Sequence, residues 1–487
     1  MRRFPGTLLL TSALALGGCN LAPNYVRPAM PVSATLPTGG VYDAGRNGTA
    51  AQTAAVAPAD VAWRDFFTDP KLRNLIALAL ANNRDLRVAV ANVAQYRAQL
   101  GAQRADLFPT IAGTGSATYQ KSSAATLGGA TGAAPGGGNV ITTNRRIDIY
   151  SANIGVSAWE IDLFGRVRNL TQEAFERYLS SQEARNGAQV TLIADVANAY
   201  LTMAADQETL RIARETEKAF GETLALTRRR FSIGVASELD VRQAQSSYDS
   251  ARTQIAQSST LVAQDQNALT LLVGTTIPAE LLPAGLDPKG ATIDALPAGL
   301  SSDVLLRRPD IAEAEHNLRA ANADIGAARA AFFPQISLTA ALGSLSLGLS
   351  NLFSSGTGTW SVAPSATQTL FDFGRNKSNL RYSKASRDVA VAQYEKAIQT
   401  GFREVADALA RRGTIDAQID AQQSLRDAAA VSYRLSEARF RTGIASFLDT
   451  LDSQRTLFSA EQTLVTTRLT RQTNLVELYR SLGGGLS

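Results

Sequence analysis

The sequence has very few of the side chains that enzymes use for metal binding and covalent catalysis. Its 487 residues include one cysteine, Cys19, and one histidine, His316. A single cysteine cannot form a disulfide within the chain, and one cysteine with one histidine cannot supply the usual zinc sites. A lone histidine on a helix, as in "IAEAEHNLRAA", is most often structural or solvent-facing. These counts argue against an enzyme.

Phosphate-binding and nucleophile motifs are also lacking. "GTGSAT" (113–118) has no third glycine of a dinucleotide-binding loop, and "GGATGAAPGGGN" (128–139) has no Gly-Lys-Ser/Thr of a P-loop. We find no nucleophile motif. The sequence therefore predicts no catalytic residue, no metal site and no cofactor.

Long apolar runs and single-sign charge blocks are absent as well. No stretch of some 18 apolar residues follows the N-terminus, so a membrane could be crossed only by strands. The 48 basic and 43 acidic residues are interspersed, which excludes a nucleic-acid-binding stripe. With 7% aromatic and 19% charged residues, the composition favours helices with narrow apolar seams over one large core.

The N-terminus has the pattern of an export signal. "MRRFPGTLLLTSALALGGCN" combines a basic start, a short apolar run and small residues before Cys19. "LGGC" resembles the lipobox of bacterial lipoproteins, which predicts cleavage after residue 18 and lipidation of Cys19. The alternative is an ordinary signal peptide followed by an incidental thiol. Asn20 is not the aspartate that retains such lipoproteins in the inner membrane, so outer-membrane sorting remains open.

The chain is internally duplicated. Eight of sixteen positions are identical between "RFSIGVASELDVRQAQ" (230–245) and "RFRTGIASFLDTLDSQ" (439–454), at an offset of 209. "LFGR" (163–166) returns in "FDFGR" (371–375) at the same offset, and "RADLFP" (104–109) returns as "RAAFFP" (329–334) at an offset of 225. The 16-residue difference between the two offsets falls between Pro109 and Leu163, where the second half lacks the Gly-rich stretch 126–139. Each half therefore follows one plan of helix, hairpin, very long helix, glycine break and helix.

Around each expected hairpin the apolar residues alternate. In "PQISLTAAL" and "WSVAPSAT", Ile336, Leu338, Trp360 and Val362 alternate with polar residues, and "YSANIGVS" (150–157) does likewise. Runs of 9 to 12 residues suit tilted membrane strands, although a soluble sandwich hairpin has the same pattern. Since the smallest outer-membrane barrels need about eight strands, four strands in a membrane require several chains to pool them.

Two runs of about 65 residues without proline, Arg166–Phe231 and Arg375–Phe440, predict helices of about 100 Å. Their Ala-rich, widely spaced apolar positions favour coiled-coil packing. Return helices are expected over about 237–273 and 446–482.

Glycine and a Ser-x-x-Asp pattern mark the tip of each helical hairpin. Gly234 and Gly443 are expected as C-caps, followed by capping boxes from Ser237 to Asp240 and from Ser446 to Asp449. Capping alone accounts for Asp240 and Asp449. Asp452 has Gln243 as its counterpart, and Leu448 precedes it on the same helical face. In a symmetric ring, Asp452 would form a ring of carboxylates that favours cations; outside a ring it is a solvated acid.

Three long passages carry a family resemblance, together with both "FGR" landmarks and both tips. They are "CNLAPNYVRPAMP" (19–31), "WRDFFTDPKLRNLIALALANNRDLRVA" (63–89) and "LLRRPDIAEAEHNLRAANADIGAARAAFFPQISLTA" (305–340). Over essentially the whole mature chain, the sequence resembles the TolC-like outer-membrane factor family, specifically the lipoprotein efflux (NodT/OprM-like) branch of RND-type tripartite pumps.

The resemblance implies a mixed α and β fold in a homotrimer. Four strands per chain would form a shared twelve-strand β-barrel in the outer membrane of a Gram-negative bacterium, continued by a long periplasmic α-helical coiled-coil barrel. Such proteins are passive exit ducts for small molecules, opened by a periplasmic adaptor (membrane fusion) protein and powered by an inner-membrane RND-type pump. Runner-up functions are a type I protein-secretion exit duct and a periplasmic coiled-coil scaffold outside the lipid.

By position, the resemblance implies a periplasmic gate at Leu448, Asp449 and Asp452. It also implies adaptor contacts at the two tips, formed by Gly234, Val235, Ala236, Ser237, Gly443, Ile444, Ala445 and Ser446. The expected segments are a signal peptide (1–18), an acylated extended segment (19–70), first-repeat helices (71–107), a first β-hairpin (108–162), a long helical hairpin (163–275), an equatorial linker (276–300), second-repeat helices (301–331), a second β-hairpin (332–372), and a second long helical hairpin with the C-terminal segment (373–487).

Overall fold

The computed structural model describes residues 20–42, 61–121, 146–287, 290–293 and 301–486. The chain forms two compact units. The strand unit comprises the described residues of Met1–Arg27, Gln95–Tyr178 and His316–Ala390, and the hairpin unit comprises those of Pro28–Ala94, Leu179–Glu315 and Val391–Ser487. The expected signal peptide, Cys19 and the Gly-rich stretch 126–139 lie outside the described residues.

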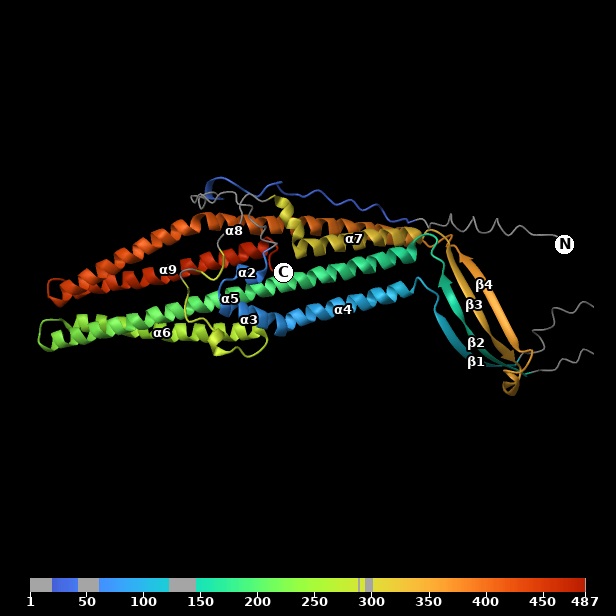
Figure 1. Cartoon of the computed structure of the whole chain (residues 1–487), viewed down its shortest axis with the longest axis horizontal. Coiled ribbons are helices and arrows are strands. Elements are labelled where there is room, and N and C mark those ends of the chain that lie inside the picture. Colours follow the sequence, from blue (N-terminus) through green and yellow to red (C-terminus); the bar gives the residue numbers. More distant parts are fainter. Residues whose placement is uncertain (1–19, 43–60, 122–145, 288–289, 294–300, 487) are drawn as a thin grey trace, which may run out of the picture. The chain divides into compact units, whose positions relative to one another are not determined.

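The strand unit contains one antiparallel sheet of four strands in the order β1-β2-β3-β4 (Figure 1). The strands are β1 (Ile111–Lys121), β2 (Arg146–Glu160), β3 (Gln335–Ser346) and β4 (Gly358–Thr367). Each half of the duplicated sequence contributes one hairpin, and the pairing of β2 with β3 joins the two halves. β1 and β4 are therefore the two edges of the sheet.

The register gives the sheet one apolar and one polar face. Ile154 lies opposite Leu342, which lies opposite Trp360, so these three side chains share a face because directly paired residues point the same way. On the other face, hydroxyl pairs lie 2.8 Å apart, Ser116 with Ser151 and Ser337 with Ser365. The predicted alternation is confirmed along β3 and β4.

One feature of the sheet departs from that alternation. Between Val156 and Trp159 the register of β2 against β3 shifts, and Ala158 has φ +50° with its N–H donating to Thr339 Oγ1 at 3.1 Å. The shift inserts one extra residue into β2, which is a β-bulge. The alternation predicted over residues 150–157 therefore does not continue past Ala158.

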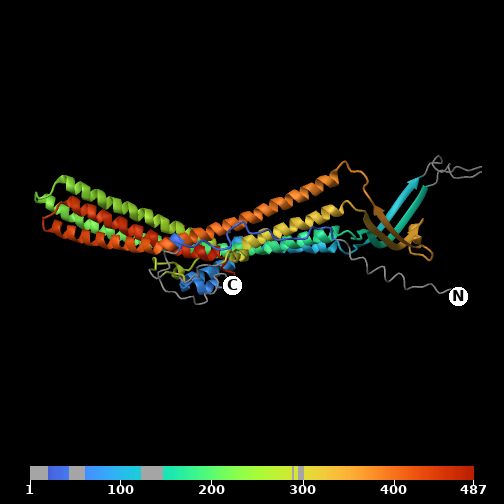
Figure 2. The same cartoon turned by 90° about the horizontal axis from the view of Figure 1, so that it is seen from above.

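Two helices of 67 residues each follow the hairpins: α5 (Arg166–Ser232) and α8 (Arg375–Arg441). Each extends one residue beyond its expected end. The return helices are α6 (Glu238–Val273) and α9 (Phe447–Ser481), and both views show α6 beside α5 and α9 beside α8 in the hairpin unit (Figures 1 and 2). The equal lengths of α5 and α8 confirm the duplicated plan.

The hairpin unit has a compact aromatic core beside these helices. Helix α2 (Trp63–Phe66) and the following residue place Phe66 and Phe67 against Tyr479 of α9, with the Phe66 and Tyr479 rings stacked at 4.0 Å. Helix α3 (Pro70–Asn82) begins with Asp69 as N-cap and proline at N1, which is a favourable helix start. The carboxylate of Asp69 also accepts a hydrogen bond from Tyr200 Oη of α5 at 2.7 Å. These contacts fix the N-terminal helices to α5 and α9.

The remaining helices are α4 (Arg84–Ala105), α7 (Pro309–Ala330) and the short 3-10 helices η1 (Gly40–Tyr42), η5 (Ala279–Leu281), η6 (Ser302–Arg307) and η7 (Leu349–Asn351). The segment 19–70, expected to be extended, thus includes η1 and α2. None of the helices in the described part of the chain has a stretch long and apolar enough to span a membrane.

Candidate functional site

Both helical hairpin tips are built by the same backbone motif. Gly234 (φ +78°) donates to the carbonyl of Phe231, and Val235 donates to that of Arg230, both at 2.9 Å. Gly443 (φ +81°) and Ile444 repeat these bonds to Phe440 and Arg439. This is the Schellman motif, whose left-handed residue strongly favours glycine, so the two expected C-caps are confirmed.

The caps that start the return helices differ between the tips. At the first tip, Ser237 N–H donates to Asp240 Oδ2 at 2.9 Å and Asp240 N–H donates to Ser237 Oγ at 3.1 Å, which is a complete capping box. At the second tip, Asp449 N–H donates to Ser446 Oγ at 3.3 Å. The reciprocal bond to the Asp449 carboxylate is not present among the described residues. The expected second capping box is therefore wrong in this half, and capping does not use the Asp449 carboxylate.

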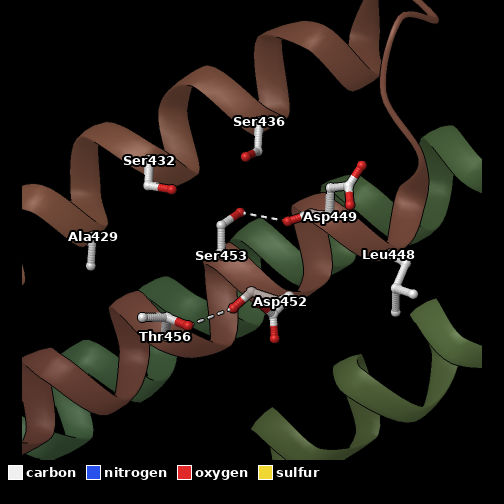
Figure 3. Close-up of a pocket in the computed structure, with 8 residues that line it drawn as sticks. All are labelled: Ala429, Ser432, Ser436, Leu448, Asp449, Asp452, Ser453 and Thr456. Carbon is white, nitrogen blue, oxygen red and sulfur yellow. Dashed lines mark hydrogen bonds between the residues drawn. The ribbon is translucent and has the colours of Figure 1, made fainter.

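The three expected gate residues lie together on the exposed side of the first two turns of α9. Leu448 is 60% exposed, and Asp449 and Asp452 are also exposed, whereas Phe447 and Leu451 on the opposite side are buried. Figure 3 shows the three side chains beside an open groove of about 460 Å³. The other residues that line it are Ala429, Ser432, Ser436, Ser453 and Thr456.

Hydroxyl groups line much of this groove, and two of them donate to backbone carbonyls of their own helix. Ser453 Oγ donates to the backbone carbonyl of Asp449 at 2.9 Å, and Thr456 Oγ1 donates to that of Asp452 at 2.9 Å (Figure 3). The carboxylates of Asp449 and Asp452 are thus the charged groups that face the groove. A leucine beside exposed carboxylates can serve as an apolar constriction with a cation-attracting rim.

The two hairpins share a core directly behind the tips. Its buried residues come from α5, α6, α8 and α9: Phe220, Leu224, Ala244, Ala251, Phe440, Phe447 and Leu451. At the edge of this core, Arg230 of the first hairpin lies over the Phe440 ring, with its guanidinium carbon 4.7 Å from the centroid. Arg230 Nη1 also donates to the Phe440 carbonyl at 2.9 Å. Arg230 is not among the predicted functional residues, although it opens the repeated passage.

The expected adaptor-contact residues are presented at the tips. Val235 and Ile444 are large exposed apolar side chains at equivalent positions, directly after the two tip glycines. Ala236, Ser237, Ala445 and Ser446 complete the two turns, and none of the four is buried. Each tip therefore offers an exposed apolar side chain directly after its glycine, and the first tip also exposes Ile233 directly before its glycine.

The described residues contain no cluster of three or more His, Cys, Asp or Glu side chains that could hold a metal ion. His316 contacts Glu176 between α7 and α5, with Nδ1 and Oε2 2.7 Å apart. A carboxyl pair, Asp206 and Asp265, lies between α5 and α6, where burial and a hydrogen bond to Asp206 raise the pKa of Asp265 to about 6.

Residues 75–275 and 300–484 match the model of the family described as "Outer membrane efflux protein". The chain belongs to the outer membrane efflux protein family. This membership confirms the resemblance in the sequence and the expected role as an outer-membrane efflux component, in place of the secretion duct or the scaffold. The family's description names efflux at the outer membrane.

Relatives of this family member cover nearly its whole length. The probable efflux pump outer membrane protein TtgC of Pseudomonas putida is 50% identical over 478 residues, which is 98% of this chain and 95% of TtgC. The cation efflux system protein CusC of Escherichia coli is 38% identical over 480 residues, 97% of this chain and 98% of CusC.

Solved structures have the same fold. The open state of the MtrE outer membrane channel of Neisseria gonorrhoeae has a TM-score of 0.82 and 38% identity, with 96% of this chain and 99% of MtrE covered. A membrane protein of Pseudomonas aeruginosa has a TM-score of 0.85 and 36% identity, with 96% and 98% covered. The expected fold class is confirmed by these neighbours.

Proposed function

We propose that three copies of this chain form a passive exit duct for small molecules across the outer membrane. A periplasmic adaptor protein would open the duct at the hairpin tips, and an inner-membrane RND-type pump would supply the energy. The observation that carries this proposal is the sheet of the strand unit, which has one apolar face, one polar face and two open edges.

The sheet cannot remain as a single chain presents it. Ile154, Leu342 and Trp360 on its apolar face are all exposed, which favours contact with lipid. The edges β1 and β4 carry backbone N–H and C=O groups that the hydrocarbon cannot satisfy, so each edge needs another strand. Three chains with four strands each reach twelve strands, which exceeds the roughly eight that the smallest membrane barrels need.

The gate is assigned to the second hairpin tip. Around a threefold axis, Leu448, Asp449 and Asp452 of each chain would face their counterparts and narrow the periplasmic end of the duct. Each carboxylate would then lie near like charges, which repel one another and attract cations. The exposed position of all three side chains on α9 supports this assignment.

The adaptor would dock on the two tips, around Val235 and Ile444. Lipidation at Cys19 would attach the N-terminus to the outer membrane, since each buried methylene contributes about 0.8 kcal/mol. The residues that follow Cys19 lie on α7: Arg329 Nη1 donates to the Leu21 carbonyl at 2.9 Å, and Asn322 Nδ2 donates to that of Pro23 at 2.7 Å. These two bonds would hold an anchored N-terminus against the strand unit.

The pump would select the transported substrate. Relatives named for toluene, antibiotic and cation efflux all share nearly the full length of this chain. One duct architecture therefore serves chemically unlike substrates, which supports a passive role.

Planar lipid bilayers test the proposed duct. The full-length protein, extracted in detergent from outer membranes, should insert and give discrete conductance steps with a preference for cations. Protein that is correctly folded by circular dichroism but gives no steps, even after addition of the adaptor, would refute the duct.

A further inference from the structure

The first turns of α8 carry an excess of positive charge that the equivalent turns of α5 do not have. The stretch "RNKSNLRYSKASRD" (375–388) contains five basic residues and one acid. Its equivalent at the offset of 209, "RVRNLTQEAFERYL" (166–179), contains three basic residues and two acids. Both stretches begin a 67-residue helix that follows a β-hairpin. The duplicated fold therefore does not require the extra charge.

Three of these basic residues form a row along one side of the helix. Lys377, Arg381 and Lys384 are spaced by four and by three residues, so their side chains project from the same side of α8. All three are exposed, whereas Ser383 of the same turns is buried. The equivalent residues on α5 are Arg168, Gln172 and Phe175. This basic row therefore occurs once in the duplicated chain.

The basic row has no acidic partner in the part of the chain that the structure describes. On α5, each arginine of the equivalent stretch forms an ion pair: Arg166 with Glu160 at 2.5 Å, Arg168 with Asp162 at 3.3 Å and Arg177 with Glu173 at 2.7 Å. On α8, Arg387 pairs with Asp388 at 2.8 Å, which uses the one acid of the stretch 375–388. The three cations of the basic row form no ion pair or side-chain hydrogen bond with a described residue.

The acid that precedes the helix is also occupied. Asp372 Oδ1 accepts from Gly374 N–H at 2.8 Å, and Asp372 Oδ2 accepts from Asn376 N–H at 2.9 Å. These bonds hold the Asp372 carboxylate at the start of α8. The charges of the basic row are therefore left for a group outside the chain.

The basic row lies directly after the strands. β4 ends at Thr367 and α8 begins at Arg375, and both belong to the strand unit (Figure 1). Between them, Leu370, Phe371 and Phe373 are 92%, 75% and 92% exposed. Aromatic side chains collect at the boundary of a bilayer, and Lys and Arg beyond it reach the headgroups. Exposed apolar residues followed by unpaired cations therefore match the order in which a chain leaves a membrane.

We propose that the basic row binds the headgroups of anionic phospholipids in the periplasmic leaflet of the outer membrane. The ligand is a phosphodiester with a net negative charge, and the three cations contact its phosphate oxygens. The row extends over about 10 Å of α8, which is close to the roughly 8 Å over which a charged surface acts at physiological salt. This inference rests on the proposed function, which places the sheet in the outer membrane, and adds the class of lipid that the strand unit recognises.

The interior of the proposed duct is the other place where the basic row could lie. Three unpaired cations per chain would form a ring of like charges there, and such a ring favours anions. The carboxylates of Asp449 and Asp452 favour cations, so the two ends of the duct would then oppose each other. At the membrane surface, the same cations meet a charge of the opposite sign. Charge complementarity therefore favours the lipid.

Native mass spectrometry with added lipid tests the proposal. The full-length protein in detergent, incubated with equal amounts of phosphatidylglycerol and phosphatidylcholine, should retain phosphatidylglycerol preferentially. The variant Lys377→Gln/Arg381→Gln/Lys384→Gln should bind it at least about fivefold more weakly, which is the contribution of a single basic residue at an anionic surface. Equal retention by the variant and the unmodified protein would overturn the inference. Dissociation of the variant into monomers would assign the row to a contact between copies and would also overturn it.

Two control variants separate charge at this place from charge elsewhere. Arg411→Gln/Arg434→Gln/Arg439→Gln removes three exposed arginines from the same helix, beyond the strand unit, and should retain phosphatidylglycerol as the unmodified protein does. Lys377→Arg/Arg381→Lys/Lys384→Arg keeps the three charges in place and should also retain it. A loss in either control as large as that in the test variant would contradict recognition by the charges of the basic row.

Inorganic phosphate distinguishes a lipid site from a site for free phosphate. At an ionic strength matched with sodium chloride, phosphate should displace no more phosphatidylglycerol than chloride does, because a lipid is also held by its acyl chains. Selective displacement by phosphate would overturn the assignment to lipid.

Ion selectivity in planar bilayers separates failure of this inference from failure of the proposed duct. If the test variant keeps its lipid but prefers cations more strongly than the unmodified protein, the row lies inside the duct, and the inference fails while the duct stands. If the unmodified protein gives no conductance steps, the proposed function fails, and with it the membrane position that the inference requires. Loss of lipid with unchanged selectivity is the result that we expect.

Discussion

Removing the guanidinium of Arg230 should release the two helical hairpins from each other at their tips. Arg230 is on α5, and its group lies 4.7 Å over the Phe440 ring of α8 and donates to the Phe440 carbonyl at 2.9 Å. We propose that opening of the duct separates the two hairpins at their tips, which assigns this contact to the closed arrangement. Arg230→Met keeps the side chain's length but removes the charge and the donor.

The magnitude follows from the two lost interactions. A partly exposed cation–π contact contributes about 0.5–1 kcal/mol, and a hydrogen bond from a charged donor contributes about 1.5 kcal/mol at the lower end of its range. Solvent at the half-exposed Arg230 reduces the sum to about 1–2 kcal/mol. A change of that size shifts the ratio of open to closed duct by about 5- to 30-fold.

Single-channel recording in planar bilayers measures that ratio directly. Arg230→Met should raise the open probability by about this factor with little change in the conductance of the open state. Arg229→Met removes the same charge one residue earlier, from an exposed side chain, and should leave the open probability near that of the unmodified protein. Equal open probabilities for the two variants would refute a closing role for Arg230.

Three further predictions concern the gate, a partly buried carboxyl group and the anchor. Leu448→Ala/Asp452→Ala should raise single-channel conductance several-fold by widening the constriction, whereas the first-tip equivalents Leu239→Ala/Gln243→Ala should change it little; equal effects would contradict a gate at the second tip. Burial and the bond to Asp206 raise the pKa of Asp265 to about 6, so the folded state holds a proton that the unfolded chain loses near pH 4, and stability should fall as pH rises from about 4 to 6. Asp265→Asn should therefore raise the melting temperature at pH 7, because it raises the free energy of unfolding by at most about 1 kcal/mol after solvent screening. Below pH 4 the variant and the unmodified protein should melt at the same temperature. A difference between their melting temperatures that is constant over all pH values would contradict this. Cys19→Ser should abolish labelling by a clickable fatty acid, and labelling that persists would contradict lipidation at this residue.

The order of helices and strands was predictable from the sequence, because the chain contains an internal repeat and its apolar residues follow the periodicity of helices and strands. The duplicated passages at 230–245 and 439–454 predicted two hairpin tips, and the Schellman glycines Gly234 and Gly443 occupy them. The proline-free runs predicted both 67-residue helices to within one residue. Local patterns sufficed here, because caps and helix lengths depend on neighbours within a few positions.

Contacts between distant residues could not be predicted in this way. The bulge at Ala158 depends on how β2 pairs with β3, nearly 180 residues later, and no local pattern encodes that register. The missing half of the second capping box depends on the side-chain orientation of Asp449, since the same Ser-x-x-Asp pattern forms the complete box at Ser237. Arg230 was overlooked because its partner Phe440 lies 210 residues away in the sequence.

The number of chains in the particle tests the central claim most directly. Native mass spectrometry of the full-length protein, extracted in detergent from outer membranes, counts the copies. A mass of three chains is predicted, because a four-stranded sheet with two open edges cannot close a membrane barrel alone. A mass of one chain for protein extracted from the outer membrane would contradict a duct whose wall is formed by several copies.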